Sequence, residues 1–216
     1  MTAQHYRRLY GHAELHAVHL IRCASAGRPL LPAADEAMAL LAAQHPPLTA
    51  HDAALATVGA LARLSYAALR AAAPDTREPA ADRWPPVAPC APVPEQVRAI
   101  TAALDRHDWD LLAVGAHPHG HTSVELARLA MAEQLPTGRP LHESALGPLV
   151  RALAHGPTPH AALMSVLSAA VELALSCLCE LVVRGAPGQG DEATLARLLD
   201  DFELHKVTHT AGTAPA

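Results

Sequence analysis

A row of histidines on one face of the first predicted helix is the feature of this chain best suited to chemistry. Its members lie alternately four and three residues apart: His5, Leu9, His12, His16, His19 and Cys23. An α-helix has 3.6 residues per turn, so this spacing places four imidazoles and a thiol on one side. The row borders the apolar arc of the helix, which is compatible with a lined pocket or with ordinary solvated histidines.

Imidazole is a common ligand of zinc and of iron, and a pair at positions i and i+4 of a helix can reach one ion. His12 and His16 form such a pair, and His19 is a third candidate ligand. We expect Glu172, on a later helix, to supply a carboxylate, and His19 or His205 to complete the shell. The alternative is that the row binds no ion.

The long apolar segment near the C-terminus carries one polar stripe, spaced three or four residues apart, with Glu172 at its centre: Ser165, Ser168, Glu172, Ser176 and Cys179. One interpretation is that a mostly buried helix turns this stripe to water. The other sets Glu172 opposite the histidine row, because a buried carboxylate needs a partner to stay charged. The stripe alone does not decide between them.

A loop before residue 122 holds three alternating histidines, His117, His119 and His121. They resemble a metal site in a loop. However, Thr122 and Glu125 have the spacing of a capping box, which would explain the glutamate as a helix cap without an ion.

The last predicted helix ends with Asp201, His205 and His209, each four residues from the next. These side chains share a face and are candidate ligands. Because few residues follow them, a frayed and solvated helix end is the competing interpretation.

Signatures of several enzyme classes are missing from the chain. It has no Glu-x-x-His pair of the di-iron bundles, no His-Glu-x-x-His, no P-loop and no Gly-x-Ser-x-Gly turn. The histidine row therefore favours a metal-binding helical protein, which could be a small-molecule oxidase or hydrolase. It does not define the reaction.

Composition limits the classes of partner. The net charge of −5, with histidine neutral, gives no electrostatic reason to expect nucleic acid. Four cysteines in a 216-residue chain are not a disulfide framework, and no secretory signal is visible at the start, so we expect reduced thiols in the cytoplasm.

The elements that must position these residues are all helical. Half of the residues are apolar but only 3% are aromatic, which suits closely packed helices rather than a β-sandwich. Periodicity, caps and proline breaks predict helices over 4–24, 33–44, 51–73, 95–107, 122–136, 142–155, 160–184 and 191–209. A Thr49-x-x-Asp52 capping-box variant marks the start of the third.

Seven prolines between Pro74 and Pro94 exclude a helix and predict an extended crossing strap. Trp84 within the strap is expected to pin it to the body of the protein. The segment 161–183 is long enough to span a bilayer. Its Glu172 and Glu180 would be costly in lipid, which favours a central bundle helix and no membrane partner.

The sequence thus predicts an all-α, single-domain bundle of about seven to eight helices over residues 1–216. Helical parts span 4–73 and 95–209, a proline-rich strap 74–94 and a short tail 210–216. The expected function is binding of a transition metal, zinc or iron, and of a small-molecule ligand, through His12, His16, His19, Glu172 and His205. The alternative is a non-catalytic interaction or regulatory module without cofactor, forming a homodimer through small residues of the long helix.

Overall fold

The protein is built from α-helices, as the sequence predicts. The computed structural model describes residues 2–73, 84, 94–113, 119–132, 159–185 and 191–211. These residues form seven helices and no strand: α1 (Ala3–Ser25), α2 (Leu30–Gln44), α3 (Ala50–Ala72), α4 (Pro94–Ala113), α5 (Gly120–Met131), α7 (Pro159–Gly185) and α8 (Asp191–Ala211). The helix predicted over 142–155 and the tail after 211 lie outside the described residues.

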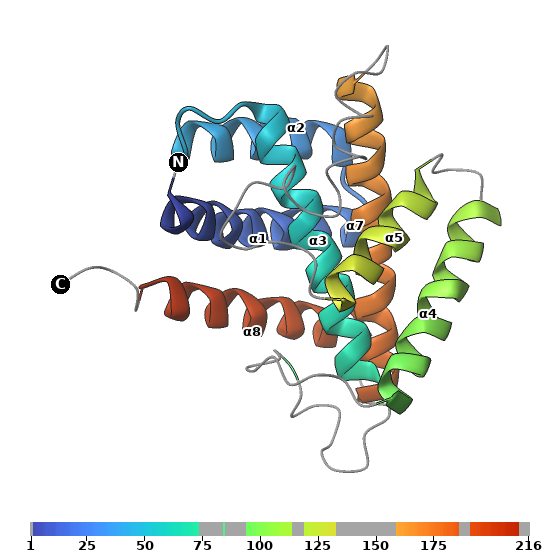
Figure 1. Ribbon diagram of the computed structural model, residues 1–216. Helices are drawn as coiled ribbons and strands as arrows, with labels where there is room; N and C mark the ends of the chain where they lie inside the picture. Colours follow the sequence, from blue (N-terminus) through green and yellow to red (C-terminus); the bar gives the residue numbers. More distant parts are fainter. Residues whose placement is uncertain are drawn as a thin grey trace.

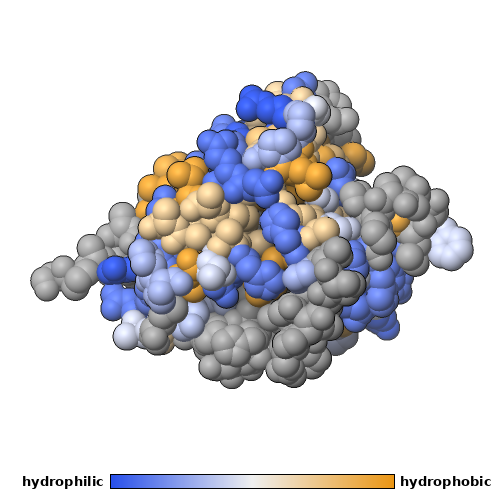
Figure 2. All heavy atoms as spheres, turned by 90° about the horizontal axis from the view of Figure 1, so that it is seen from above, coloured by the Kyte–Doolittle hydropathy of each residue, from blue (hydrophilic) through white to orange (hydrophobic). Residues whose placement is uncertain are grey.

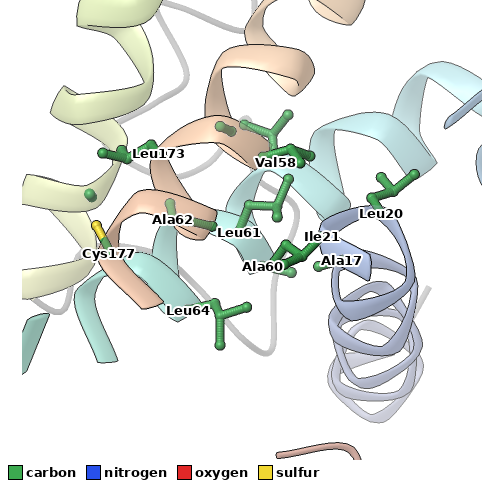
Figure 3. Close-up of a cluster of buried hydrophobic side chains, with 14 of the residues drawn as sticks. Ala17, Leu20, Ile21, Val58, Ala60, Leu61, Ala62, Leu64, Leu173 and Cys177 are labelled. Atoms are coloured by element: carbon green, nitrogen blue, oxygen red, sulfur yellow. The ribbon is translucent and has the colours of Figure 1, made fainter. Parts of the chain in front are cut away.

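Two helices, α3 and α7, run side by side through the middle of the molecule (Figure 1). The prediction of a long apolar central helix is confirmed by α7, and α3 shares its position, packing against α1, α2, α4, α5 and α7. By length and composition α7 could cross a membrane, but most of its apolar part is buried inside the protein. The core is filled with small aliphatic side chains, as Figure 3 shows for Ala17, Leu61 and Leu173.

The remaining helices lie on either side of this central pair. In Figure 1, α4 and α5 are on the right, whereas α1, α2 and α8 extend to the left. The α1 and α2 helices are antiparallel neighbours, so the start of α1 lies beside the end of α2, at the ends remote from α7. This arrangement determines which histidines can meet.

Local hydrogen bonds define the helix starts. The Thr2 side chain accepts from the His5 backbone N–H at 3.3 Å, and Thr49 and Asp52 form the predicted reciprocal capping box of α3. The corresponding prediction for α5 is wrong. That helix begins at Gly120 without a side-chain cap. Glu125 pairs instead with Arg128 one turn later, at 2.8 Å.

Trp84 anchors the strap, as predicted. Its side chain is buried, and its indole N–H donates to the backbone oxygen of Leu198 at 2.9 Å. The ring also stacks on Phe202 of α8, with centroids 5.7 Å apart. Trp84 is thus held against α8, whereas the rest of the predicted strap, 74–83 and 85–93, lies outside the described residues.

A charged contact joins the second half of α4 to the last turns of α7. Glu180 accepts from Arg106 at 3.1 Å and pairs with Arg184 at 2.6 Å, and His107 Nε2 lies 3.4 Å from its second oxygen. Contact with His107, together with the charges of Arg184 and Arg106, outweighs burial and holds the pKa of Glu180 below its usual value. Arg184 also donates to the Ala72 backbone oxygen at the end of α3.

We expect Glu180→Gln to cost about 1–2 kcal/mol of unfolding free energy at pH 7, because the neutral amide loses charge-assisted bonds. A carboxyl group whose pKa is lower in the folded than in the unfolded protein stabilises the fold at pH values above the unfolded pKa. This stabilisation is lost as the pH falls through the folded pKa. The difference between parent and E180Q should therefore shrink below the ordinary pKa of 4.5. Urea unfolding across pH 7 to 3 measures this difference in unfolding free energy.

Glu172→Gln, on the same helix but without an ion pair to a described residue, is the control. An equal loss in both variants would contradict this assignment.

Candidate metal site

The histidine row of α1 lies at the border of the core, as its periodicity predicts. Leu9 and Cys23 at two of its positions are buried. His5, His12 and His16 are half-buried and His19 is exposed. The members of the row therefore have different surroundings, and His19 is the exposed one.

The five predicted ligands do not form a single set. No three His, Cys, Asp or Glu side chains among the described residues are placed to hold one ion. Glu172 is half-buried on α7, and no described residue pairs with it. The first half of α1, which carries His12, extends away from α7 (Figure 1). His205 is half-buried on α8.

Two of the α1 histidines interact with their own helix. His19 Nε2 lies 3.6 Å from the Cys23 Sγ atom one turn later. Burial, followed by the neighbouring His19 and His12, lowers the pKa of His16. Among the described residues, neither ring has a hydrogen bond or an ion pair to another helix.

His12 meets a residue that the sequence predictions passed over, His45. The His45 Nε2 atom is 2.9 Å from His12 Nδ1, so one ring donates an N–H and the other accepts with its lone pair. The ring centroids are 4.9 Å apart. His45 is only 5% exposed, making it the most deeply placed imidazole of the cluster.

His5 completes a group of three imidazoles, which we call the imidazole cluster (His5, His12, His45). Its ring lies edge-on to that of His45, with centroids 5.2 Å apart. Its Nε2 atom is buried and has no hydrogen-bond partner in the part of the chain that the structure describes. A buried polar nitrogen without a partner is costly, so this atom is poised for an acceptor or a ligand.

Local sequence explains why these rings meet. Residues 5 and 12 are seven apart and share one face of α1. His45 is the residue that ends α2: its N–H bonds to the Ala42 backbone oxygen at 3.1 Å, and the following Pro46 cannot continue the helix. Antiparallel packing of α1 and α2 then brings this end of α2 to the first turns of α1 (Figure 1).

His45, the buried member of the imidazole cluster, is neutral at physiological pH. Burial, followed by the charges of His12, His5 and Arg8, lowers the pKa of His45 to about 4. A neutral imidazole keeps one ring nitrogen lone pair free, which is the form that binds a metal ion or accepts a proton. The arrangement therefore brings three imidazoles from two segments of the chain into contact, with His12 and His45 joined directly.

The other predicted histidine groups are not gathered in this way. His121 pairs with Asp108 of α4 at 2.9 Å, while His117 lies outside the described residues. Asp201 at the end of α8 is exposed, and the side chain of His209 is not among those described.

The polar stripe of α7 is half-buried at Ser165 and exposed at Ser176 and Cys179, which fits the prediction of a stripe turned toward the surface. It brings no carboxylate to the imidazole cluster.

The fold and the cluster define an all-α helical protein with a three-histidine contact between its first two helices. The chain matches no known family model, no curated protein and no solved structure. The functional inference therefore depends on the geometry of the cluster.

Proposed function

We propose that the protein binds a transition-metal ion through the imidazole cluster of His5, His12 and His45. The observation that carries this proposal is the direct contact of two imidazoles, 2.9 Å between His12 Nδ1 and His45 Nε2, beside the buried His5 Nε2, which has no hydrogen-bond partner among the described residues. Of the ligands predicted from sequence, His12 is kept. His16, His19, Glu172 and His205 are replaced by His5 and His45.

Ion binding requires the rings to rearrange, because as they lie no three of the described side chains are placed to hold one ion, and the hydrogen bond between His12 and His45 must be given up. Zinc–nitrogen bonds of about 2.0–2.1 Å in a tetrahedral site place two nitrogens about 3.3 Å apart, so the His12–His45 pair must open by about 0.4 Å. The His5 ring must also turn its buried nitrogen toward the pair. An all-imidazole set suits zinc, copper, nickel or iron and disfavours magnesium and calcium.

Three protein ligands leave one coordination position open. An open position is what a catalytic zinc or iron site needs for water or a small molecule, whereas structural zinc sites are closed by four protein ligands. Hydrolysis or oxidation of a small molecule is thus the class of activity that such a site would serve. The half-buried His5 and His12 leave it reachable from solvent.

Zinc titration calorimetry of untagged protein tests the ligand set. We expect one zinc per chain, and a loss of affinity of about 100-fold or more in the double variant His12→Gln with His45→Gln. The matched control, His16→Gln with His19→Gln, removes two other imidazoles of the same row and should retain affinity within about threefold.

Folding of each variant is checked by thermal unfolding in a chelator. If the buried His45 substitution unfolds the protein, His5→Gln with His12→Gln gives the same test without touching His45. Absence of zinc binding in the folded parent, or equal losses in the two double variants, would contradict the proposal.

An interaction module without cofactor is the second candidate function. The observation in its favour is the outer face of α2, where Leu31 and Leu40 are 53% and 51% exposed and Ala39 and Ala43 are exposed beside them. Figure 2, which views the molecule from above, shows hydrophobic residues at the surface among hydrophilic ones. This face replaces the small residues of α7 as the proposed contact surface, since Ala169, Ala170 and Ala174 of α7 are buried. Sedimentation of Leu31→Ser with Leu40→Ser tests it: a dimer that becomes a monomer supports this function.

A further inference from the structure

The outer face of α4 carries a stripe of exposed residues, which we call the α4 stripe. Its members follow one another at gaps of three, four, three and four residues, and all are exposed: Glu95, Arg98, Ala102, Asp105 and Trp109. This spacing places them on one side of the helix. The other side, with Ile100 and Leu104, is buried, and α4 lies at the edge of the molecule (Figure 1).

Trp109 is the member of the α4 stripe that a free surface explains least. It is 73% exposed, although tryptophan is enriched where proteins bind one another. Arg98 is exposed too, and no described residue engages it in a hydrogen bond or ion pair. Asp105 pairs with Arg128 of α5 at 2.5 Å, yet its side chain remains 63% exposed. The stripe therefore offers an aromatic ring and two opposite charges to a partner outside the chain.

The charges of the α4 stripe complement themselves when a second copy of the helix lies antiparallel. Ala102 is the middle position, and Glu95 and Trp109 lie seven residues, about 10 Å, on either side of it. Arg98 comes four residues before Ala102, and Asp105 comes three residues after it. An antiparallel copy crossing at Ala102 thus sets each Arg98 beside the Asp105 of the other copy. A parallel copy would set like charges side by side, which is costly.

We propose that the α4 stripe is a self-association surface, on which two copies of the chain pack their α4 helices antiparallel about Ala102. The contact is isologous, so every favourable pair occurs twice. The methyl group of Ala102 lets the two helices approach closely at the centre. Trp109 of each copy then covers the first turns of the other α4 helix, where the stem and charge of Arg98 can pack on the indole face.

The expected dimer is a weak one. A single helix from each copy buries less surface than a standard protein–protein interface, so we expect a Kd of about 10–100 µM. At the low concentrations of a fluorescence or unfolding experiment the chain is then monomeric and Trp109 is solvated. The proposal does not depend on the imidazole cluster or on the outer face of α2, which lie on the other side of the central helix pair (Figure 1).

Sedimentation equilibrium of variants with exchanged charges tests both the surface and its register. Arg98→Glu and Asp105→Arg should each weaken dimerisation about 10-fold or more, because like charges then face each other at two places. An equimolar mixture of R98E and D105R should dimerise within about threefold of the parent, since every facing pair in the mixed dimer is of opposite charge. A merely structural effect of either substitution would not be rescued by mixing.

Trp109→Ala removes the aromatic contact and should also weaken dimerisation about 10-fold or more. Arg197→Glu is the matched control for R98E. Arg197 is an exposed arginine of α8 without an ion pair to a described residue, and its reversal should leave the Kd unchanged. Thermal unfolding at low concentration checks that each variant folds. If D105R unfolds because Arg128 loses its partner, R98E and W109A against R197E still test the surface.

Four results would overturn the proposal. The first is a parent that stays monomeric up to about 500 µM, well above the expected Kd; such a result would leave the α4 stripe to a different protein. The second is a dimer that R98E and W109A leave intact, and the third is an equal loss in R98E and R197E. The fourth is a mixture of folded R98E and D105R that associates no better than either variant alone, which would exclude the antiparallel register.

Discussion

Leu61→Ala should lower the free energy of unfolding by about 3–5 kcal/mol, among the largest effects of any single substitution in this chain. Leu61 is fully buried in the middle of α3, and α3 packs against α1 and α7 (Figure 3). The surrounding side chains are mostly alanine, valine and leucine on packed helices, which cannot move far to fill the space. Urea unfolding followed by circular dichroism measures the loss.

Leu40→Ala is the control for that experiment, because it deletes the same atoms from the exposed face of α2. Its effect should stay within about 0.5 kcal/mol. If L61A were no more destabilising than L40A, α3 would not be the centre of the core.

Trp84→Ala should cost about 3 kcal/mol or more, since it removes a buried indole together with its hydrogen bond to Leu198 and its stacking on Phe202. The tryptophan fluorescence should change with it. The chain has two tryptophans, and Trp109 is 73% exposed, so emission from a buried environment comes from Trp84. W84A should therefore shift the emission maximum toward that of solvated indole.

Trp109→Ala provides the matched control: it removes the same side chain from a solvated position and should leave stability within about 0.5 kcal/mol. Its remaining emission should be that of a buried indole. A W84A protein as stable as the parent would show that Trp84 does not fasten the strap to α8.

The helices were predictable from sequence because their ends carry local signals. Thr49 and Asp52 set the start of α3 within one residue. The predicted start of α2 at residue 33 is three residues late, since Pro32 is tolerated in a first helical turn. The cap predicted from Thr122 and Glu125 failed because helix formation extends to Gly120 and the glutamate pairs with Arg128.

The site was only partly predictable. Periodicity placed His5 and His12 on the correct face of α1, because the face of a helix on which a residue lies depends only on spacing within that helix. Their meeting with His45 depends on the antiparallel packing of α1 and α2, which spacing within one helix cannot encode. The signal for it was present in His45-Pro46-Pro47, which fixes a histidine at the end of the second helix, facing the start of the first. Glu172 was predicted as a ligand because it is a carboxylate on a polar stripe. However, its helix α7 meets α1 at the end of α1 that is remote from His5 and His12 (Figure 1).

Nitrogen NMR of the histidine rings, recorded with and without one equivalent of zinc, tests the central claim most directly. Metal coordination changes the chemical shift of the ligating ring nitrogen, so each imidazole reports for itself. The imidazole cluster predicts large shifts at His12 Nδ1 and His45 Nε2 and at the Nε2 of His5, with His16 and His19 unchanged. Shifts confined to His16 and His19, or to none of the five rings, would contradict it.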